Sequence, residues 1–398
     1  MKLVVVTSRF PYPLEKGDKL RLYFQIKYLA QRHEITLLSL ADEPISTNSL
    51  EHIKSFCKAV HVFPIHKNNA QWSAIKSLLG KTPLEVSYFF NQKIKRKFEE
   101  IIHQVQPDHI YCQLIRMSEY VRHLPYPKTL DYMDAFSIGM QRRAENSNPI
   151  AKAIFQRDAL QIADYESVIY HDFDHHTIIS EQDRKHLNFL GKEKIHVLPN
   201  GVDTHFFAPM PDIEKKYDLA FVGNMGYYPN VQASLFLAKK ILPKLREQFP
   251  KINLLIAGAR PTQEVKNLAD ENIQVTGWVE DIRIAYASAN VFVAPIFYGR
   301  GQQNKILEAM SMGIPCITSD QVNQAIGAKN GTSILIANDE KSCQEQISLL
   351  LKNEELQQKL SANGLNWIRS NFSWEKYGKQ LEGLILNFEF LKNVFITV

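Results

Sequence analysis

The chain lacks the features that mark several large classes of protein. Its cysteines stand apart, with no C-x-x-C spacing, which argues against a cysteine metal cluster and favours reduced thiols; they are Cys57, Cys112, Cys316 and Cys343. No apolar run approaches the ~20 residues of a membrane-spanning helix. The opening MKLVVVTSRFPYP holds an apolar stretch too short for a signal peptide. These absences predict a cytoplasmic protein.

A strong charge of one sign is also lacking. The formal net charge is +5, with 27 Lys and Arg against 22 Asp and Glu in residues 1–200 and 20 against 20 in residues 201–398. Without a strongly basic domain or a recognition motif, we expect no nucleic acid partner. Part of the excess is the run Lys93, Lys95, Arg96 and Lys97, close in sequence to Trp72, Tyr88, Phe89 and Phe90. This mixture fits peripheral contact with the inner face of the cytoplasmic membrane, whereas the commoner interpretation is a solvated helix face.

Strands and helices alternate along the chain. Apolar, β-branched runs predict strands at 2–7, 35–40, 59–63, 108–112, 128–132, 176–180, 218–222, 252–257, 273–276, 290–294 and 314–318. This rhythm indicates parallel sheets with helices on both faces, and 398 residues exceed what one core organises. We expect an α/β chain of two Rossmann-like, doubly wound domains, 1–198 and 199–373, followed by a helix over 374–398 that packs back towards the first domain.

Ligands of such sheets bind beyond the carboxyl ends of strands, where the next helix begins. The familiar phosphate-binding motifs are absent there. The first junction has the single glycine Gly17, flanked by Lys16 and Lys19, in place of G-x-G-x-x-G. The segment from Gly299 to Ile306 departs from a Walker loop at its last glycine and at its Ser or Thr. A nicotinamide dinucleotide domain and a nucleoside triphosphatase are therefore not expected.

The stretch YGRGQQNKILEAMSMG suggests another anion site. Asn304 is predicted to cap a helix that begins near Lys305, and Asn230 to cap the helix that follows Gly223. Lys305 and Glu308 are three residues apart and share a helix face. A cation and a carboxylate at the positive end of a helix dipole suit a nucleoside diphosphate, with Lys305 on phosphate oxygens and Glu308 on ribose hydroxyls.

These motifs, in this order, resemble a known family. LPNGVD, then GN after a strand, then GRGQQNKILEAMSMGIPCI look like the second domain of the retaining glycosyltransferases of family 4, which have the GT-B fold of two domains facing a central cleft. The likeness spans nearly the whole chain. RFPYPLEKGDKLR and GRGQQNKILEAM are similar to the sugar transferases associated with bacterial exopolysaccharide and PEP-CTERM systems.

The resemblance implies roles for individual residues. It places Glu308 at the donor ribose, Lys305, Asn304 and Gly17 at the diphosphate, and the backbone near Val279 at the base. Residues at the same junctions complete the expected donor set, and they are Gly223, Asn224, Arg300 and Gly301. The sequence departs from many members in having Arg300 in place of a Glu and Asn224 in place of an Arg, so the basic clamp rests on Lys305 with Arg300 or a lysine of the first domain.

Two further clusters have competing interpretations. Asp131 and Asp134 follow a strand at the carboxyl edge, so Asp134 is either an acceptor-side or sugar-side catalytic residue or a helix cap. Asp131, Lys16 and Lys19 are assigned to the acceptor side. The cluster HDFDHH resembles metal ligands in composition only, since it precedes a strand, and no metal site is expected.

The sequence thus predicts a retaining hexosyltransferase. It would move a hexose from a UDP- or GDP-sugar to a hydroxyl of a glycan or lipid-linked glycan acceptor, with Lys305, Glu308 and Asp134 as its catalytic residues. The donor is a substrate, and no cofactor or metal is expected. A sugar-nucleotide epimerase of the same architecture and a non-catalytic partner protein that has kept the fold remain alternatives.

Overall fold

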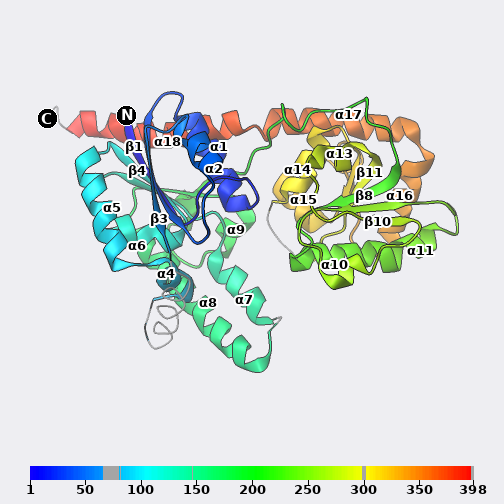
Figure 1. Ribbon diagram of the computed structural model, residues 1–398, viewed down its shortest axis with the longest axis horizontal. Coiled ribbons are helices and arrows are strands. Elements are labelled where there is room, and N and C mark those ends of the chain that lie inside the picture. Colours follow the sequence, from blue (N-terminus) through cyan, green and yellow to red (C-terminus); the bar gives the residue numbers. More distant parts are fainter. Residues whose placement is uncertain (66–79, 81, 146, 298–301, 396–398) are drawn as a thin grey trace. The chain divides into compact units, whose positions relative to one another are not determined.

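The computed structural model describes residues 1–398 except 66–79, 81, 146, 298–301 and 396–398 (Figure 1). The chain forms two compact units. Unit 1 consists of Met1–Pro199 and Trp374–Val398, and unit 2 of Asn200–Ser373. The sequence places the domain boundaries at 198/199 and 373/374, and the two units meet at 199/200 and 373/374.

Unit 1 is built on a parallel sheet with the strand order β3-β2-β1-β4-β5-β6-β7 within the described residues. Its strands are β1 (Lys2–Thr7), β2 (Glu34–Ala41), β3 (Ala59–Pro64), β4 (His109–Gln113), β5 (Lys128–Asp131), β6 (His175–Ile178) and β7 (His196–Val197). In β1, Val4 and Val6 belong to one buried cluster while Leu3 and Val5 belong to another. Because successive side chains point to opposite faces, a continuous apolar run such as LVVV in β1 requires cover on both sides of the sheet.

Helices supply that cover in unit 1. They are α1 (Gly17–Leu29), α2 (Thr47–Lys54), α4 (Leu84–Phe89), α5 (Gln92–Val105), α6 (Ser118–Val121), α7 (Phe136–Glu145), α8 (Pro149–Tyr170), α9 (Glu181–His186) and α18 (Trp374–Phe395), with 3₁₀ turns η1 (Ile115–Met117) and η2 (Lys192–Lys194). Although α18 follows unit 2 in the sequence, it packs against α1, where Phe24 stacks on Trp374 with ring centroids 4.9 Å apart. Glu382 accepts from Arg32 at 3.1 Å and lies 3.0 Å from His33, so polar contacts also hold α18 in place.

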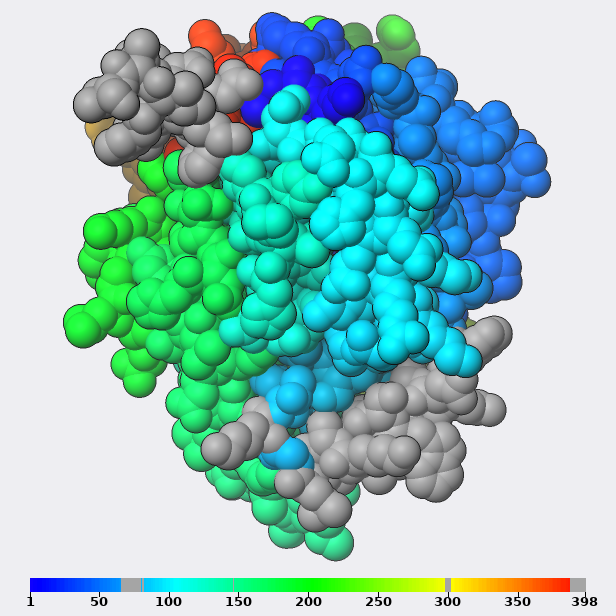
Figure 2. All heavy atoms as spheres, turned by 90° about the vertical axis from the view of Figure 1, so that its left-hand side faces the viewer, coloured from blue at the N-terminus to red at the C-terminus, as the bar shows by residue number. Residues whose placement is uncertain are grey.

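Helix α5 carries the basic run and lies on the face of unit 1 shown in Figure 2, in cyan. It buries Phe98 and Ile102, and Asn91 caps it by accepting from two backbone N–H groups. The neighbouring Phe89 is buried and Phe90 packs against the same core. These aromatic side chains therefore serve the interior, which favours the solvated-face interpretation of the lysines.

Unit 2 has a parallel sheet with the strand order β10-β9-β8-β11-β12-β13 within the described residues. Its strands are β8 (Tyr217–Val222), β9 (Leu254–Ala257), β10 (Ile273–Val275), β11 (Ala289–Ala294), β12 (Cys316–Thr318) and β13 (Leu335–Ile336). Its helices are α10 (Tyr228–Phe236), α11 (Leu242–Leu245), α12 (Gln263–Lys266), α13 (Ile282–Ala287), α14 (Asn304–Ser311), α15 (Asp320–Ile326), α16 (Glu340–Lys352) and α17 (Glu354–Asn371), with a π-helical turn at Leu237–Ile241. Both units are doubly wound α/β, as predicted.

Candidate functional site

Lys305 lies in the first turn of α14, which begins beyond the carboxyl end of β11. Its ammonium donates to Asn230 Oδ1 at 2.5 Å and to Gln303 Oε1 at 3.3 Å, and lies 5.5 Å from the centre of the Phe221 ring. Protein atoms surround the side chain although it keeps some accessible surface, and this desolvation lowers the pKa of Lys305 to about 8. The amine is thus held by neutral oxygens, so its charge remains available to an anion.

Glu308 lies one turn further along α14. It accepts a hydrogen bond from the buried Tyr286 hydroxyl at 2.7 Å. Desolvation raises the pKa of Glu308, while the hydrogen bond and the charge of Lys305 oppose the rise. One cation and one oriented carboxylate at a helix N-terminus can bind a phosphate group and a pair of hydroxyls side by side.

Glycines create the space around Lys305. A Cβ on Gly223 would lie 2.8 Å from Asn230 Nδ2 and 3.3 Å from Lys305 Cε. Gly258 has a φ of +136° and its Cβ would lie 1.8 Å from the Gly223 carbonyl oxygen. The loops after β8 and β9 therefore approach one another more closely than any side chain would allow.

Two helix caps expected from the sequence are wrong. The N-cap of α14 is Gln303, and Asn304 is already helical, with no hydrogen-bond partner for its Oδ1 among the described residues. The N-cap of α10 is Tyr227, so Asn230 lies inside that helix, where its Nδ2 donates to the Asn224 carbonyl at 2.9 Å while its Oδ1 holds Lys305. Asn230 is thus a site residue, which the sequence analysis had assigned to a helix cap. Its partner Lys305 is 75 residues away, so no local pattern shows the contact.

The other predicted donor residues of unit 2 are arranged differently. Asn224 is exposed and its side chain accepts from the Gly226 amide within its own loop at 3.0 Å. Val279 is half-buried in the loop after β10, where it and Leu255 line the same pocket. Arg300 and Gly301 lie outside the described residues.

In unit 1, Gly17 opens α1 at the carboxyl edge of the sheet. A Cβ there would meet no atom within 4 Å, so packing does not require glycine at this position. Lys16 and Lys19 are half-buried on either side of it. The α1 N-terminus therefore offers an open backbone flanked by two cations.

Asp131 at the end of β5 is fully buried. Both of its oxygens accept from Arg21, at 2.6 and 3.1 Å, and also from Tyr111 and Thr177. With its lone pairs committed, the carboxylate positions α1 and the neighbouring strands, and this geometry favours a structural role over contact with an acceptor.

Asp134 follows β5 and is exposed. Desolvation by the surrounding atoms and repulsion from the Asp183 carboxylate raise the pKa of Asp134 to about 7. A carboxylic group that titrates near neutrality can accept and release a proton.

Sequence reasoning missed a pair of arginines at the same edge. Arg9, after β1, donates to Asp18 at 2.7 Å. Arg116, after β4, is only 6% exposed and lies 3.6 Å from Glu85 and 4.7 Å from the Phe89 ring centre. Burial lowers the pKa of Arg116, and its Nε has no hydrogen-bond partner among the described residues. In the sequence, only the apolar neighbours of Arg116 indicate that this residue is buried.

In the described part of the chain, no group of three or more His, Cys, Asp and Glu side chains is arranged to hold a metal ion. Nor is any of its helices both long and apolar enough to cross a membrane.

The chain is similar in sequence to known proteins, among them glycosyltransferases. A family model described as "Glycosyl transferases group 1" matches residues 216–353, which lie within unit 2. A Klebsiella pneumoniae protein described as "Uncharacterized 44.6 kDa protein in cps region" is 24% identical over 396 residues, covering 94% of this chain and 97% of that protein. A phosphatidyl-myo-inositol mannosyltransferase of Mycobacterium leprae is 26% identical over 206 residues, covering 50% of this chain and 54% of its own.

Solved structures share the fold across the whole chain. The sucrose-phosphate synthase of Thermosynechococcus elongatus gives a TM-score of 0.72 at 14% identity and covers 100% of both chains. Anabaena Alr3699/HepE, solved in complex with UDP, gives 0.68 at 13% identity and covers 97% of this chain and 100% of that one. The same protein has also been solved in complex with UDP-glucose.

Proposed function

We propose that this chain, a glycosyltransferase of group 1 type with the GT-B fold, moves a hexose from a nucleoside-diphosphate sugar to a hydroxyl and retains the anomeric configuration. The observation that carries the proposal is that Lys305 and Glu308 lie one turn apart in α14, close enough for the charge of Lys305 to act on the pKa of Glu308. The proposal is also supported by Anabaena Alr3699/HepE, which shares the fold and has been solved in complex with UDP and with UDP-glucose.

In this proposal the donor lies along the carboxyl edge of the unit 2 sheet. Lys305 binds the diphosphate, Glu308 binds the ribose hydroxyls, and the backbone of Val279 meets the base. Gly223, Asn224 and Asn304 border the phosphates, together with Arg300 and Gly301. The donor is a substrate, and the proposal includes no cofactor or metal.

The chemistry then depends on orientation and on charge stabilisation. The acceptor hydroxyl attacks the face of the sugar that the diphosphate leaves, and the leaving phosphate oxygen takes the acceptor proton. Negative charge grows on the diphosphate during this step, and Lys305 neutralises it. A preorganised hydrogen-bond donor such as the Lys305 ammonium contributes a factor on the order of 10²–10³ to the rate.

Unit 1 is proposed to bind the acceptor, a glycan or a lipid-linked glycan of surface polysaccharide synthesis. Lys16, Lys19 and Asp134 are its proposed acceptor-side groups, and peripheral contact with the inner face of the cytoplasmic membrane would bring it to a lipid-linked substrate. Asp131 belongs to this region as the residue that fixes α1 through Arg21.

The test is donor turnover with and without saccharide acceptors, followed by chromatography of the sugars and NMR of the new linkage. Transfer with retained configuration supports the proposal. An altered free sugar released without an acceptor would indicate an epimerase. Nucleotide binding without turnover of any donor would indicate a non-catalytic partner protein.

A further inference from the structure

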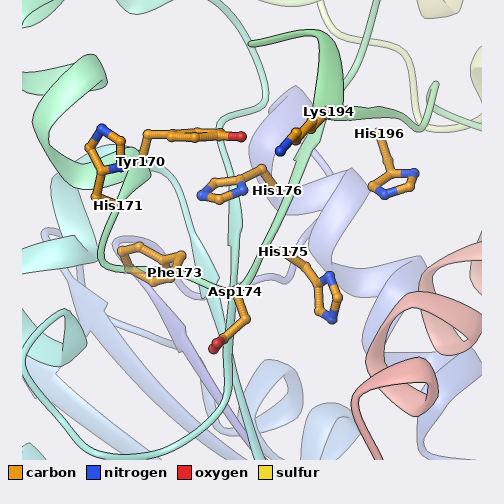
Figure 3. Close-up of a pocket in the computed structure, with 8 residues that line it drawn as sticks. All are labelled: Tyr170, His171, Phe173, Asp174, His175, His176, Lys194 and His196. Carbon is orange, nitrogen blue, oxygen red and sulfur yellow. The ribbon is translucent and has the colours of Figure 1, made fainter. Parts of the chain in front are cut away.

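Helices α7 and α8 form a hairpin that projects from unit 1. In Figure 1 the two helices lie side by side and run away from the sheet towards the turn between them. The opposite end of α8 is fixed to the body of the unit. There the Tyr170 ring stacks on His176 with centroids 4.3 Å apart (Figure 3), and the Tyr170 hydroxyl donates to the Gly191 carbonyl at 3.0 Å. The hairpin thus presents its turn on an anchored support.

Exposed apolar side chains gather on α8. Ile150, the second residue of the helix, is 79% exposed, and Ile154 is 37% exposed. Residues four apart share a helix face, so these two isoleucines form one apolar surface near the turn. Their neighbour Phe155 packs against the core instead. Among the described residues of unit 1, the large apolar side chains that are exposed are Ile150, Ile154, Leu160 and Val168 of α8, together with Leu190 and Leu386.

The exposed charges beside this apolar surface are mostly positive. They are the cations of Arg143, Lys152 and Arg157 and the carboxylate of Glu145. The Arg143 guanidinium lies 4.4 Å from the centre of the Phe155 ring, and Arg157 donates to a backbone carbonyl at 3.0 Å. These contacts orient two of the cations close to the isoleucines, at the end of the hairpin that lies far from the sheet.

The remaining charged groups of the hairpin leave this excess in place. Arg142 is half-buried, so it adds less to the surface charge. Asp158 and Glu166 are each 1% exposed, and both accept hydrogen bonds inside the unit. Asp164 is exposed, but it lies seven residues beyond Arg157, about 10 Å along the helix axis. This separation exceeds the Debye length of about 8 Å at physiological ionic strength, so Asp164 does not cancel the charge of the tip.

A partner that suits exposed isoleucines flanked by cations has an anionic surface above an apolar interior. We propose that the tip of the α7–α8 hairpin docks on an anionic lipid bilayer. Ile150 and Ile154 would enter the boundary between headgroups and acyl chains, and Arg143, Lys152 and Arg157 would face the lipid phosphates. The membrane contact is thus assigned to the hairpin, and not to the basic run of α5, whose aromatic neighbours pack in the core.

The inference rests on the proposed function only for its purpose, which is to hold unit 1 beside a lipid-linked acceptor. The docking itself depends on the exposed side chains of the hairpin. It can therefore be tested without any donor or acceptor.

Flotation of the full chain with vesicles tests the docking. The vesicles consist of phosphatidylcholine alone or of an equal mixture of phosphatidylcholine and phosphatidylglycerol. We expect roughly tenfold or tighter binding to the anionic vesicles, and weaker binding at high ionic strength. Equal binding to both compositions would show that charge does not select the partner and would overturn the proposal, as would binding to neither.

Variants with matched controls locate the contact. Ile150→Asp removes an apolar contact and leaves α8 intact, because an acidic residue is favourable in the first turn of a helix. It should weaken binding to the anionic vesicles roughly tenfold or more, whereas Leu190→Asp, at another exposed apolar residue of unit 1, should not. Lys152→Glu should weaken this binding roughly tenfold, whereas Lys97→Glu, at an exposed lysine of α5, should not. Loss of binding in Lys97→Glu with full binding in both hairpin variants would overturn the assignment.

Titration with UDP separates a failure of this inference from a failure of the proposed function. The hairpin variants should bind UDP as the wild type does. UDP binding by a wild type that binds no vesicles would overturn the docking and leave the nucleotide site standing, whereas vesicle docking without UDP binding would support the hairpin and count against the transferase alone. A dimer that Ile150→Asp dissociates, in a chain that binds no vesicles, would identify a second copy as the partner and overturn the proposal.

Discussion

Asn230→Asp tests the arrangement around Lys305 with a change of very small volume. It places a carboxylate where the Oδ1 atom now lies 2.5 Å from the ammonium. Two unit charges 4 Å apart interact by about 4 kcal/mol at an effective dielectric constant of 20. Because Lys305 keeps some accessible surface, we take about half of this, ~2 kcal/mol, as the cost to a bound diphosphate.

That cost corresponds to roughly thirtyfold weaker binding of the nucleoside diphosphate. The measurement is calorimetric titration of UDP and GDP into wild type and Asn230→Asp. The control is Asn353→Asp, at the N-cap of α17, where either residue accepts the capping hydrogen bond. Thermal unfolding accounts for the lost Nδ2 hydrogen bond to Asn224, worth about 1 kcal/mol. Affinity equal to that of the control would refute the assignment of Lys305 to the diphosphate.

Three other outcomes follow from the structure. Since the pKa of Lys305 is lowered to about 8, its charge is present below that pH and lost above it, so diphosphate affinity should be level up to about pH 7 and fall above pH 8; a level profile to pH 9.5 would contradict this. Gly258→Ala should cost about 3 kcal/mol or more in chemical unfolding, because its Cβ would clash with the Gly223 carbonyl, while Gly331→Ala, whose Cβ meets nothing within 4 Å, should cost about 1 kcal/mol; equal costs would contradict the close approach. Burial lowers the pKa of His109 to about 3, whereas its value in the unfolded chain is about 6.5. The unfolded chain therefore binds a proton more readily, and the free energy of unfolding is full above pH 6.5 and falls as the pH drops towards 3, by roughly 3 kcal/mol at pH 4. His109→Gln should unfold less steeply with acid, and an unchanged acid profile would show that His109 does not contribute.

The strands were predictable from sequence because their signal is local. LVVV within KLVVVT is a continuous apolar run, and β1 covers the six residues of that segment. The strand β13 was missed, since its two residues, Leu335 and Ile336, make no run that stands out. Helix starts were less predictable: α14 begins one residue after its unexpected cap Gln303, because Asn304 had the composition of a cap but not the backbone geometry.

The site was predictable only where its residues share an element. Lys305 and Glu308 lie on one helix, so their common face could be read from their spacing. Their partners come from elsewhere in the fold, Asn230 from α10 and Tyr286 from α13, and no local sequence pattern predicts these contacts. Arg116 is similar, because a charged residue whose burial depends on distant aromatic rings looks ordinary in the sequence.

The central claim is that unit 2 binds a nucleoside diphosphate through Lys305. The most direct measurement is a thermal shift of wild type and Lys305→Ala with UDP, GDP, ADP, NAD and ATP. A ligand at a hundred times its dissociation constant adds about 2.7 kcal/mol of stability. We predict that one nucleoside diphosphate stabilises the wild type and that Lys305→Ala loses this stabilisation. If none of the diphosphates stabilises the wild type, or if the variant responds equally, the claim is contradicted.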